Sequence, residues 1–354
     1  RPTVKEKANR IVVGIDVGDE ASHVYAMDTG TGEVLWDRAV ATTAEALEDL
    51  LGRWQGVRVA LEVGTHSPWL SEVLEGMGHE VLVANARKLR CIYAGTNKQD
   101  RLDARKLAWL AHAEPRLLYP IRHRRRETRE DLAVLRARHH LVRLRTELVT
   151  AVRGTVKAHG ARVPSGDTAC FPRAAASRIP QGLKRALDPL LATIAELTAR
   201  IDAYDREVEA MSRQKHPETA VLREVHGVGW LTALCFVLTL EDPGRFRKSR
   251  EVGPALGLVP RRDQSGGTDR QLSITRTGDP YLRSLLVEAA HHVLRRGAPD
   301  NDLKRWGRRR ARRGGKSGKK RAVIGVARRL AVLLHRLWVT QAAYEPLHRA
   351  KKVA

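Results

Sequence analysis

The feature that most constrains the fold is a short apolar run near the start of the chain. Residues 11–17 (IVVGIDV) are almost wholly apolar and are interrupted by a single acid, Asp16. A strand of this kind is typical of the centre of a sheet that is covered on both faces. A second run, residues 57–63 (VRVALEV), carries Glu62 near its end. The sequence therefore predicts a layered α/β domain with an acid near the end of each of two strands.

Shorter segments complete this expected domain. Residues 23–27 and 33–36 flank a turn-rich break, as the arms of a hairpin do, and residues 80–84 are a further expected strand after a helix near residues 67–77. The glycine-flanked Asp16 followed by a hairpin is also similar to the phosphate loop of the actin and sugar-kinase fold. That fold needs a second phosphate loop and a longer chain, and the sequence shows neither.

Two further acids, Asp100 and Asp103, open an expected helix in the segment KQDRLDARKLAWLAHA. Their i, i+3 spacing places both carboxylates on one face of its first turn. Acids at this place could simply cap the helix and complement its dipole. Together with Asp16 and Glu62, however, they form a set of four carboxylates, which is the kind of ligand that Mg²⁺ prefers. One or two ions held in this way can bind the oxygens that enter and leave a phosphodiester.

The net charge restricts the partners of the chain. Lys and Arg number 64 against 40 Asp and Glu, a formal charge of +24, which predicts a polyanionic partner and nucleic acid first. The longest mostly apolar stretch, residues 230–240, is too short to span a membrane, so no membrane partner is expected. No signal-peptide pattern is visible, and Cys91, Cys170 and Cys235 lack metal-ligand spacing, which predicts a reducing, cytoplasmic setting.

The middle of the chain, residues 121–215, predicts two long helices around a connector at residues 154–180. Thr128, with Asp131 three residues on, is the expected N-cap of the first helix, and Asp188 is that of the second. Apolar residues recur in both at heptad spacing, which favours an antiparallel hairpin, a dimerisation seam, or both. The predicted seam of the first helix is Val134, Ala137, Leu141, Leu144, Leu148 and Ala151. The predicted seam of the second is Leu190, Ile194, Leu197, Ile201, Tyr204, Val208 and Met211.

Two segments are expected to contact the nucleic-acid backbone. The basic run before the first long helix contains Arg124, Arg125 and Arg126. Residues 222–234 (LREVHGVGWLTAL) have a helix-hairpin-helix pattern, in which Gly227 and Gly229 form the turn. The turn amides and the N-terminus of the following helix can receive phosphate. A tight helix–helix turn without a ligand is the alternative.

A loop in the C-terminal region, residues 216–354, is predicted to carry a nucleophile. Ser265 is followed by Gly266 and Gly267, and such backbone can bend sharply and leave the hydroxyl open to a bulky reactant. Nearby arginines can donate to phosphate oxygens and offset the charge of a phosphoryl transition state. They are Arg261, Arg262, Arg270 and Arg276. On these residues alone, an arginine-rich surface turn is the alternative.

Helices are expected around this loop, at residues 249–256, 281–294 and 322–338. The stretch between the last two, residues 305–321 (RWGRRRARRGGKSGKKR), is strongly cationic and punctuated by glycine. Because like charges repel when unpaired, it is expected to be mobile until it meets nucleic acid.

The order of these parts resembles that of the insertion-sequence-110 family of transposases, the bridge-RNA-guided recombinases to which Piv-type DNA invertases are related. GIDVG, LEVGTH and QDRLDARKLA match the family's DEDD set at Asp16, Glu62, Asp100 and Asp103. HGVGWLTA, FRKSREVGPALGLVPRRDQSGG and TRTGDPYLRSLLVEAA are similar to its C-terminal transposase domain. The resemblance covers nearly the whole chain, and the middle matches in character only.

This resemblance implies an architecture and a set of partners. It implies a RuvC-like (ribonuclease-H-like) domain over residues 1–120, a coiled-coil spacer over 121–215 and a small helical transposase domain over 216–354. The four acids would hold Mg²⁺, and Ser265 would attack DNA. In the family a non-coding guide RNA, the bridge RNA, pairs with donor and target DNA. We expect a homo-oligomer, dimer or tetramer, associated with a prokaryotic nucleoid.

Three functions are compatible with the sequence. In the first, Ser265 displaces a deoxyribose 3′-oxygen and forms a 5′-phosphoseryl link, with metal-assisted activation. In the second, the chain is a metal-only nuclease of the RuvC-like junction-resolvase type, and Ser265 merely binds phosphate. In the third, it is a packaging protein that uses its basic surface, which leaves the four acids unexplained.

Overall fold

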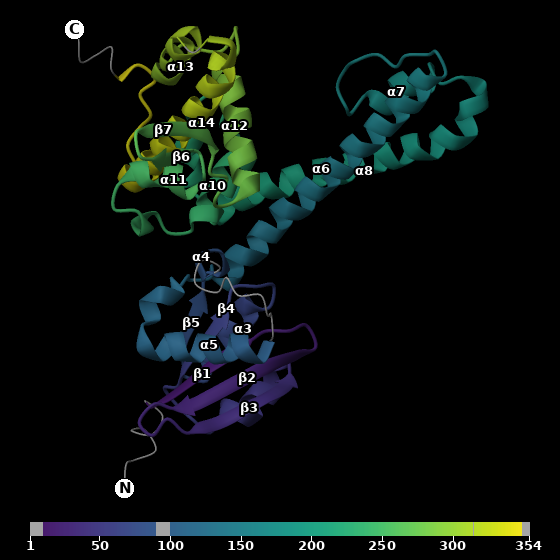
Figure 1. Cartoon of the computed structure of the whole chain (residues 1–354). Helices are drawn as coiled ribbons and strands as arrows, with labels where there is room; N and C mark the ends of the chain where they lie inside the picture. Colours follow the sequence, from purple (N-terminus) through teal and green to yellow (C-terminus); the bar gives the residue numbers. More distant parts are fainter. Residues whose placement is uncertain (1–9, 90–99, 314, 349–354) are drawn as a thin grey trace. The chain divides into compact units, whose positions relative to one another are not determined.

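The computed structural model describes residues 10–89, 100–313 and 315–348 (Figure 1). The chain divides into two compact units, residues 1–124 and 125–354. Within the described ranges, none of the helices combines the length and the apolar character that crossing a membrane requires. Cys170 is exposed and Cys235 is buried, and Cys91 lies outside the described residues.

A five-stranded mixed sheet forms the centre of the first unit, in the order β3-β2-β1-β4-β5. The strands are β1 (Ile11–Asp16), β2 (Ala21–Asp28), β3 (Val34–Ala41), β4 (Arg58–Glu62) and β5 (Glu80–Ala84). β1, β2 and β3 pair antiparallel, whereas β1, β4 and β5 run parallel. Every strand that the sequence predicts is present, so the mixed α/β architecture of this unit is confirmed.

Helices cover both faces of the sheet, as the apolar character of β1 predicts. α2 (Ala44–Leu51) and α3 (Ser67–Gly76) pack on one face, and α5 (Asp100–Ala113) packs on the other. Gly14 of β1 allows α5 to approach, because a Cβ there would overlap the carbonyl oxygen of Ala104. α2 was not expected from the sequence. A short helix, α4 (Ala86–Leu89), follows β5.

Two long helices, α6 (Arg126–Ala158) and α8 (Lys184–Gln214), lie side by side in the second unit (Figure 1). α7 (Phe171–Ala176) interrupts the expected connector and packs between their ends. Arg138 of α6 donates to both carboxylate oxygens of Asp205 of α8, at 2.6 and 3.0 Å. The two helices therefore form an antiparallel hairpin within one chain.

α6 begins before its predicted cap. Thr128 is buried inside the first turn, and the helix starts at Arg126. The Asp131 carboxylate, expected to complete the cap, accepts from Lys215 Nζ at 3.1 Å and lies 3.0 Å from His216 Nε2. The prediction is wrong because tertiary partners claim the carboxylate that the local pattern assigned to capping.

α8 also begins before its predicted cap. Asp188 and Pro189 lie inside the helix, which starts at Lys184. The extension buries Leu187, which is 3% exposed, among apolar residues of α6 and α7. Burial of a leucine side chain stabilises the fold by about 2 kcal/mol, which offsets the backbone hydrogen bond that Pro189 cannot donate.

The packed side of α6 differs from the predicted heptad seam. Its buried apolar residues are Leu132, Leu135, Val149, Val152 and Val156. The predicted positions are half-buried or exposed, and Leu144 is 51% exposed. The packed side is offset by one residue, or about 100° around the helix. The seam prediction for α6 is therefore wrong.

The seam prediction for α8 is largely confirmed. The buried residues include four of the predicted positions, namely Ile194, Ile201, Val208 and Met211. At two other positions the neighbouring residue is buried instead, Leu191 for Leu190 and Thr198 for Leu197.

The remaining helices of the second unit enclose its main core. They are α9 (Thr219–Arg223), α10 (Trp230–Leu240), α11 (Val252–Ala255), α12 (Pro280–Leu294), α13 (Asp302–Arg313) and α14 (Gly318–Thr340). α10, α12 and α14 supply most of the buried apolar residues. Asp279 caps α12, since its carboxylate accepts from the N–H groups of Tyr281 and Leu282, as the TGDP turn predicts.

The expected mobility of the cationic stretch 305–321 is wrong for its described part. Most of it belongs to α13 and to the start of α14. One side of α13 is apolar and buries Leu303. Gly307 allows the helix to pack closely, because a Cβ there would lie 2.6 Å from the side chains of Leu294 and Val326. The arginines occupy the other sides of the helix, so their mutual repulsion does not prevent packing.

Candidate functional site

Asp16 and Glu62 end neighbouring strands of the sheet. β1 and β4 are parallel, with Ile15 beside Leu61. The next residue in each strand is the acid, so Asp16 and Glu62 lie beside each other at the carboxyl edge of the sheet. Both are half-buried. The structure thus brings together the first two acids that the sequence analysis selected.

α5 directs the other two acids to the same edge. Its middle lies against Gly14 of β1, and near its C-terminus the Ala111 carbonyl accepts from Arg58 Nη1 at 3.2 Å. Because Arg58 begins β4, α5 runs opposite to that strand. The first turn of α5, with Asp100 and Asp103, therefore lies toward the carboxyl edge.

The chemistry of this edge suits a hard cation. All four selected residues are carboxylates, the ligands that Mg²⁺ takes in proteins. Asp103 Oδ1 accepts from Lys106 Nζ at 3.3 Å, and the side chain of Asp100 lies outside the described part of the chain. Among the side chains that the structure describes, no three His, Cys, Asp or Glu groups lie close enough to hold one ion. The four residues have the chemistry that magnesium prefers, and their elements bring them toward one edge of the sheet. That they bind a metal ion stays a prediction.

A histidine bridge that the sequence analysis missed lies at the same edge. His66 Nε2 is 2.9 Å from Asp19 Oδ1, and its Nδ1 accepts from Trp69 Nε1–H at 3.2 Å. An indole nitrogen only donates, so in the neutral ring Nε2 carries the proton and donates to Asp19. The bridge joins the segments that follow β1 and β4, which carry Asp16 and Glu62. The only sequence signal is the histidine in LEVGTH.

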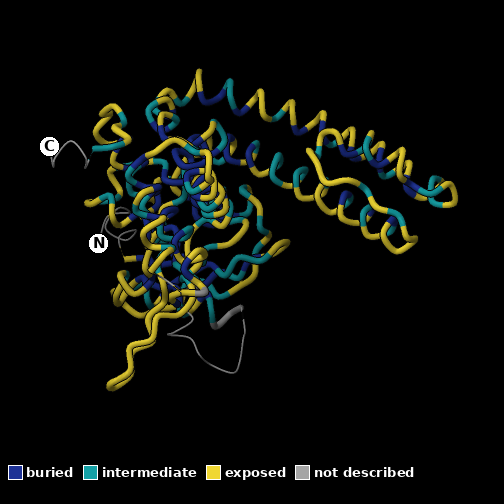
Figure 2. The backbone as a smooth tube through the Cα atoms, turned by 90° about the horizontal axis from the view of Figure 1, so that it is seen from above, coloured by how far each residue is buried: buried dark blue, intermediate teal, exposed yellow. Residues whose placement is uncertain are grey.

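Ser265 lies at the tip of a β-hairpin, where the sequence analysis expected a loop. β6 (Pro260–Ser265) pairs antiparallel with β7 (Thr268–Ile274). Gly266 has φ 54°, a left-handed conformation that glycine readily adopts in a two-residue hairpin turn. The hairpin is exposed from Pro260 to Ser273 (Figure 2). The hydroxyl of Ser265 is therefore accessible to a bulky reactant.

The four selected arginines lie along the hairpin or directly after it. Arg261 and Arg262 lie on β6, and Arg270 lies on β7. Arg276 follows β7 with φ 57°, and its N–H donates to the Gly257 carbonyl at 3.3 Å. All four side chains are exposed. Each exposed guanidinium can donate to phosphate oxygens.

The turn of the expected helix-hairpin-helix lies between α9 and α10. Gly227 has φ 91°, and a Cβ there would lie 2.8 Å from the Ala289 carbonyl oxygen, so packing alone requires glycine. Gly229 is the N-cap of α10, and no described atom lies within 4 Å of a Cβ placed there. The N-terminus of α10 is thus open to a ligand, and its contact with phosphate stays a prediction.

Arg125 and Arg126, at the start of α6, take part in ion pairs. Arg125 Nε lies 3.6 Å from Glu241 Oε1, and the Arg125 backbone N–H donates to the same oxygen at 2.8 Å. Arg126 Nε donates to Glu130 Oε1 at 3.1 Å. The side chains of Arg125 and Arg126 are 76% and 74% exposed, and pairs at such sites are weak enough for phosphate to replace the carboxylate. Arg124 is the last residue of the first unit.

Comparison with known proteins places both units in one family. The Transposase IS116/IS110/IS902 family matches residues 219–306, and the DEDD transposase family of the IS110 type matches residues 13–160. The chain belongs to the IS110 family of transposases. It is therefore a DNA transposase, as the resemblance of its motifs predicts.

Relatives of this IS110-family chain match it along most of its length. The transposase for insertion sequence element IS1111A of Coxiella burnetii is 26% identical over 94% of this chain and 91% of its own length. A probable family 20 transposase of Pseudomonas aeruginosa is 28% identical over 83% of this chain and 87% of its own. The transposase for insertion sequence element IS1328 of Yersinia enterocolitica is 26% identical over 81% of this chain and 85% of its own length.

Proposed function

We propose that this transposase is an RNA-guided DNA recombinase that cleaves and rejoins DNA through a 5′-phosphoserine intermediate. The observation that carries the proposal is the exposed Ser265 at the tip of an arginine-rich hairpin. In the other unit of the same chain, Asp16 and Glu62 end neighbouring strands, and α5, which carries Asp100 and Asp103, begins toward the same edge of the sheet. One unit thus offers a nucleophile and phosphate ligands, and the other offers ligands for a hard cation.

The first unit is proposed to be a RuvC-like, ribonuclease-H-like domain. Its support is the strand order β3-β2-β1-β4-β5, with three antiparallel strands followed by two parallel ones. The acids at the ends of β1 and β4, and those of α5, occupy the edge where a ligand binds in sheets of this kind.

The proposed reaction exchanges one ester for another. The Ser265 Oγ loses its proton and attacks the phosphorus of a DNA phosphodiester, and the bond from phosphorus to the deoxyribose 3′-oxygen breaks. The 3′-oxygen takes up a proton, and the 5′-phosphate stays on the serine. A 3′-hydroxyl of another strand then attacks the phosphoserine and restores the phosphodiester. The number of ester bonds is conserved, so the exchange needs no ATP.

The arginines and acids have separate parts in this proposal. Arg261, Arg262 and Arg270 would neutralise the phosphate during both attacks. Asp16, Glu62, Asp100 and Asp103 would hold one or two Mg²⁺ ions. A bound ion of this kind lowers the pKa of an oxygen nucleophile and stabilises a leaving oxygen. Asp103 would exchange its hydrogen bond with Lys106 for this role.

Guidance by RNA is supported by charge and by the family resemblance. The formal charge of +24 exceeds what a single DNA contact requires, and pairing by a bridge RNA would supply sequence recognition. The chain would act at the nucleoid as a homo-oligomer, and sequencing of RNA that co-purifies with the full chain tests the guide.

Trapping of covalent protein–DNA adducts tests the serine chemistry. With substrate DNA and its guide RNA, the unmodified chain should form an adduct that survives denaturation, and Ser265→Ala should form none. Thr268→Ala is a matched control, because Thr268 is another exposed hydroxyl-bearing residue of the same hairpin. Equal adduct yields from the unmodified and Ser265→Ala chains would remove serine from the mechanism. If Ser265→Ala still cleaves while Asp16→Ala does not, the chain is a metal-only nuclease.

A further inference from the structure

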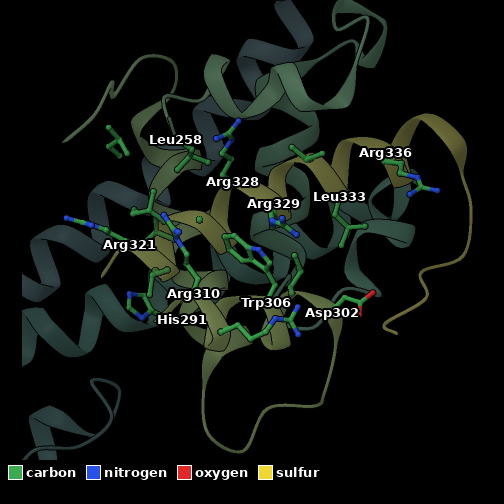
Figure 3. Close-up of a pocket in the computed structure, with 18 of the residues that line it drawn as sticks. Leu258, His291, Asp302, Trp306, Arg310, Arg321, Arg328, Arg329, Leu333 and Arg336 are labelled. Atoms are coloured by element: carbon green, nitrogen blue, oxygen red, sulfur yellow. The ribbon is translucent and has the colours of Figure 1, made fainter. Parts of the chain in front are cut away.

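A large cavity lies beside the serine hairpin in the second unit (Figure 3). Its volume is about 1910 Å³, and it is lined by the base of the hairpin, by α12, α13 and α14, and by the segment after α14. Sites for small molecules have volumes of roughly 300–1,000 Å³. The size of this cavity therefore favours a segment of a polymer.

The cavity is strongly cationic. Nine of its lining residues are Lys or Arg and two are acidic, so its charge complements a polyanion. The cations come from both helices of the lining, with Arg309 and Arg310 on α13 and Arg321, Arg328 and Arg336 on α14. A phosphate backbone bound in the cavity would meet positive charge from both helices.

Between these cations the lining is apolar. Ile324 and Val332 of α14 are half-buried and lie outside the described hydrophobic core, whereas Leu333 packs against that core. Leu272 of β7, also in the lining, is 44% exposed. Ile324 and Val332 thus add apolar surface to the lining, which a ligand with an apolar surface would cover.

A flat, rigid group lies in the wall of the cavity. The Arg329 guanidinium carbon lies 4.0 Å from the centre of the Trp306 ring, and the two side chains lie side by side in Figure 3. Gly325 leaves room for the ring, because a Cβ there would lie 2.7 Å from Trp306. A guanidinium stacked on an indole presents a planar face on which a nucleobase can stack.

We propose that this cavity binds an unpaired strand of nucleic acid, with the bases on the apolar lining and the phosphates on the arginines. A duplex keeps its bases stacked inside and presents phosphates outward, so it would leave Ile324 and Val332 without a partner. The cavity reaches the base of the hairpin at Pro260 and Leu272, so a strand bound there leads toward Ser265. The inference rests on the proposed function and adds the form of nucleic acid that is held.

Oligonucleotide binding by the full-length Ser265→Ala chain, without Mg²⁺, tests this inference apart from the serine chemistry. The probes are fluorescein-labelled 12-nucleotide oligo-dT, 12-nucleotide oligo-U and a 12-base-pair duplex, measured by anisotropy. The double variant Ile324→Ser, Val332→Ser should bind the single strands about tenfold more weakly, because base stacking on the lining is lost. Its duplex affinity should change less than about twofold. The relative loss for oligo-dT and oligo-U assigns the strand to DNA or RNA.

Two matched variants control for the helix surfaces. Val339→Ser removes a 55% exposed valine of α14 outside the cavity and should change neither affinity. Arg310→Ala should weaken every probe and lower the salt dependence, whereas Arg312→Ala, on α13 but outside the lining, should do so less. An equal loss of duplex and single-strand binding in the double variant, or no loss of either, overturns the inference.

Photo-crosslinking to the chain with an unmodified cavity lining tests the inference without relying on variants that could misfold. Single strands that contain 5-iodouracil should photo-crosslink to the peptide with Trp306 or to peptides of α14, as mass spectrometry would show. Crosslinks confined to other parts of the chain would also overturn the inference. Adduct formation by Ser265 is a separate result, so failure of the cavity and failure of the serine mechanism can be told apart.

Discussion

At the scale of single residues, His216 shows how a side chain that belongs to neither set of catalytic candidates affects stability. Its Nε2 lies 3.0 Å from Asp131 Oδ2, and its Nδ1 lies 3.5 Å from Glu218 Oε1. The hydrogen bond with the Glu218 carboxylate is the main factor that raises the pKa of His216 above 6.5, and burial opposes it. The same bond is the main factor that lowers the pKa of Glu218 below 4.5.

These two shifts define a pH window in which the cluster stabilises the fold. The contribution of His216 is fully present below pH 6.5 and is lost as the pH rises through its raised folded-state pKa. The contribution of Glu218 is present above pH 4.5 and is lost as the pH falls through its lowered folded-state pKa. The stabilisation should therefore be greatest between these two values.

The replacement His216→Gln should lower the melting temperature most near pH 5.5. We expect a loss of about 1 kcal/mol, or roughly 2–4 °C, because one charged, partly buried hydrogen-bonding pair is removed. The difference from the unmodified chain should shrink at pH 8–9. His159→Gln, at an exposed histidine that contacts the Thr155 carbonyl, is the control. A difference that is constant from pH 5 to pH 9 would contradict the assignment.

At the scale of elements, α6 has two apolar sides, and packing uses the one that the heptad count did not select. Leu135 is fully buried, whereas Leu144 is 51% exposed. Leu135→Ala should destabilise the second unit by about 2–5 kcal/mol, because it leaves a cavity in the core. Leu144→Ala should change the free energy of unfolding by less than about 0.5 kcal/mol. Thermal or urea denaturation of the two variants checks this, and similar losses would contradict the observed seam.

Elements differ in how far the sequence could predict them, for physical reasons. β1 and β4 were predictable because strands buried on both faces read as apolar runs. β6 and β7 are exposed and mostly polar, so no hydrophobic alternation marks them, and only the Gly266–Gly267 pair indicates a turn. In α6 the side chains on both sides are apolar, and the choice depends on α8 and α10, which local spacing does not contain.

The sequence could predict which residues belong to the candidate site better than it could predict the contacts among them. The placement of Asp16 and Glu62 follows from the pairing of two recognisable parallel strands. The His66 bridge could not be derived, because it joins Asp19 and Trp69 across segments that only the folded sheet brings together. The cavity beside the hairpin could not be predicted from the sequence either, since part of its lining comes from α13, where a mobile stretch was expected.

At the scale of the whole molecule, the proposed chemistry divides one reaction between the two units of the chain. The nucleophile and its arginines belong to residues 125–354, and the acids belong to residues 1–124. Each set alone has an ordinary structural explanation: the hairpin could bind phosphate, and the acids could cap strand and helix ends. If the serine chemistry depends on a metal ion held by the acids, the two sets take part in one reaction and are not independent features.

The most direct test is the yield of the Ser265–DNA adduct against Mg²⁺ concentration, in the unmodified chain and in Asp16→Ala. If the two units act on the same phosphodiester, the adduct should appear and saturate with Mg²⁺ in the unmodified chain. It should be about 100-fold or more lower in Asp16→Ala or after chelation with EDTA. Glu241→Ala, which alters an acid of the second unit, should retain the metal response. Equal adduct yields from the unmodified and Asp16→Ala chains, with or without Mg²⁺, would contradict the account.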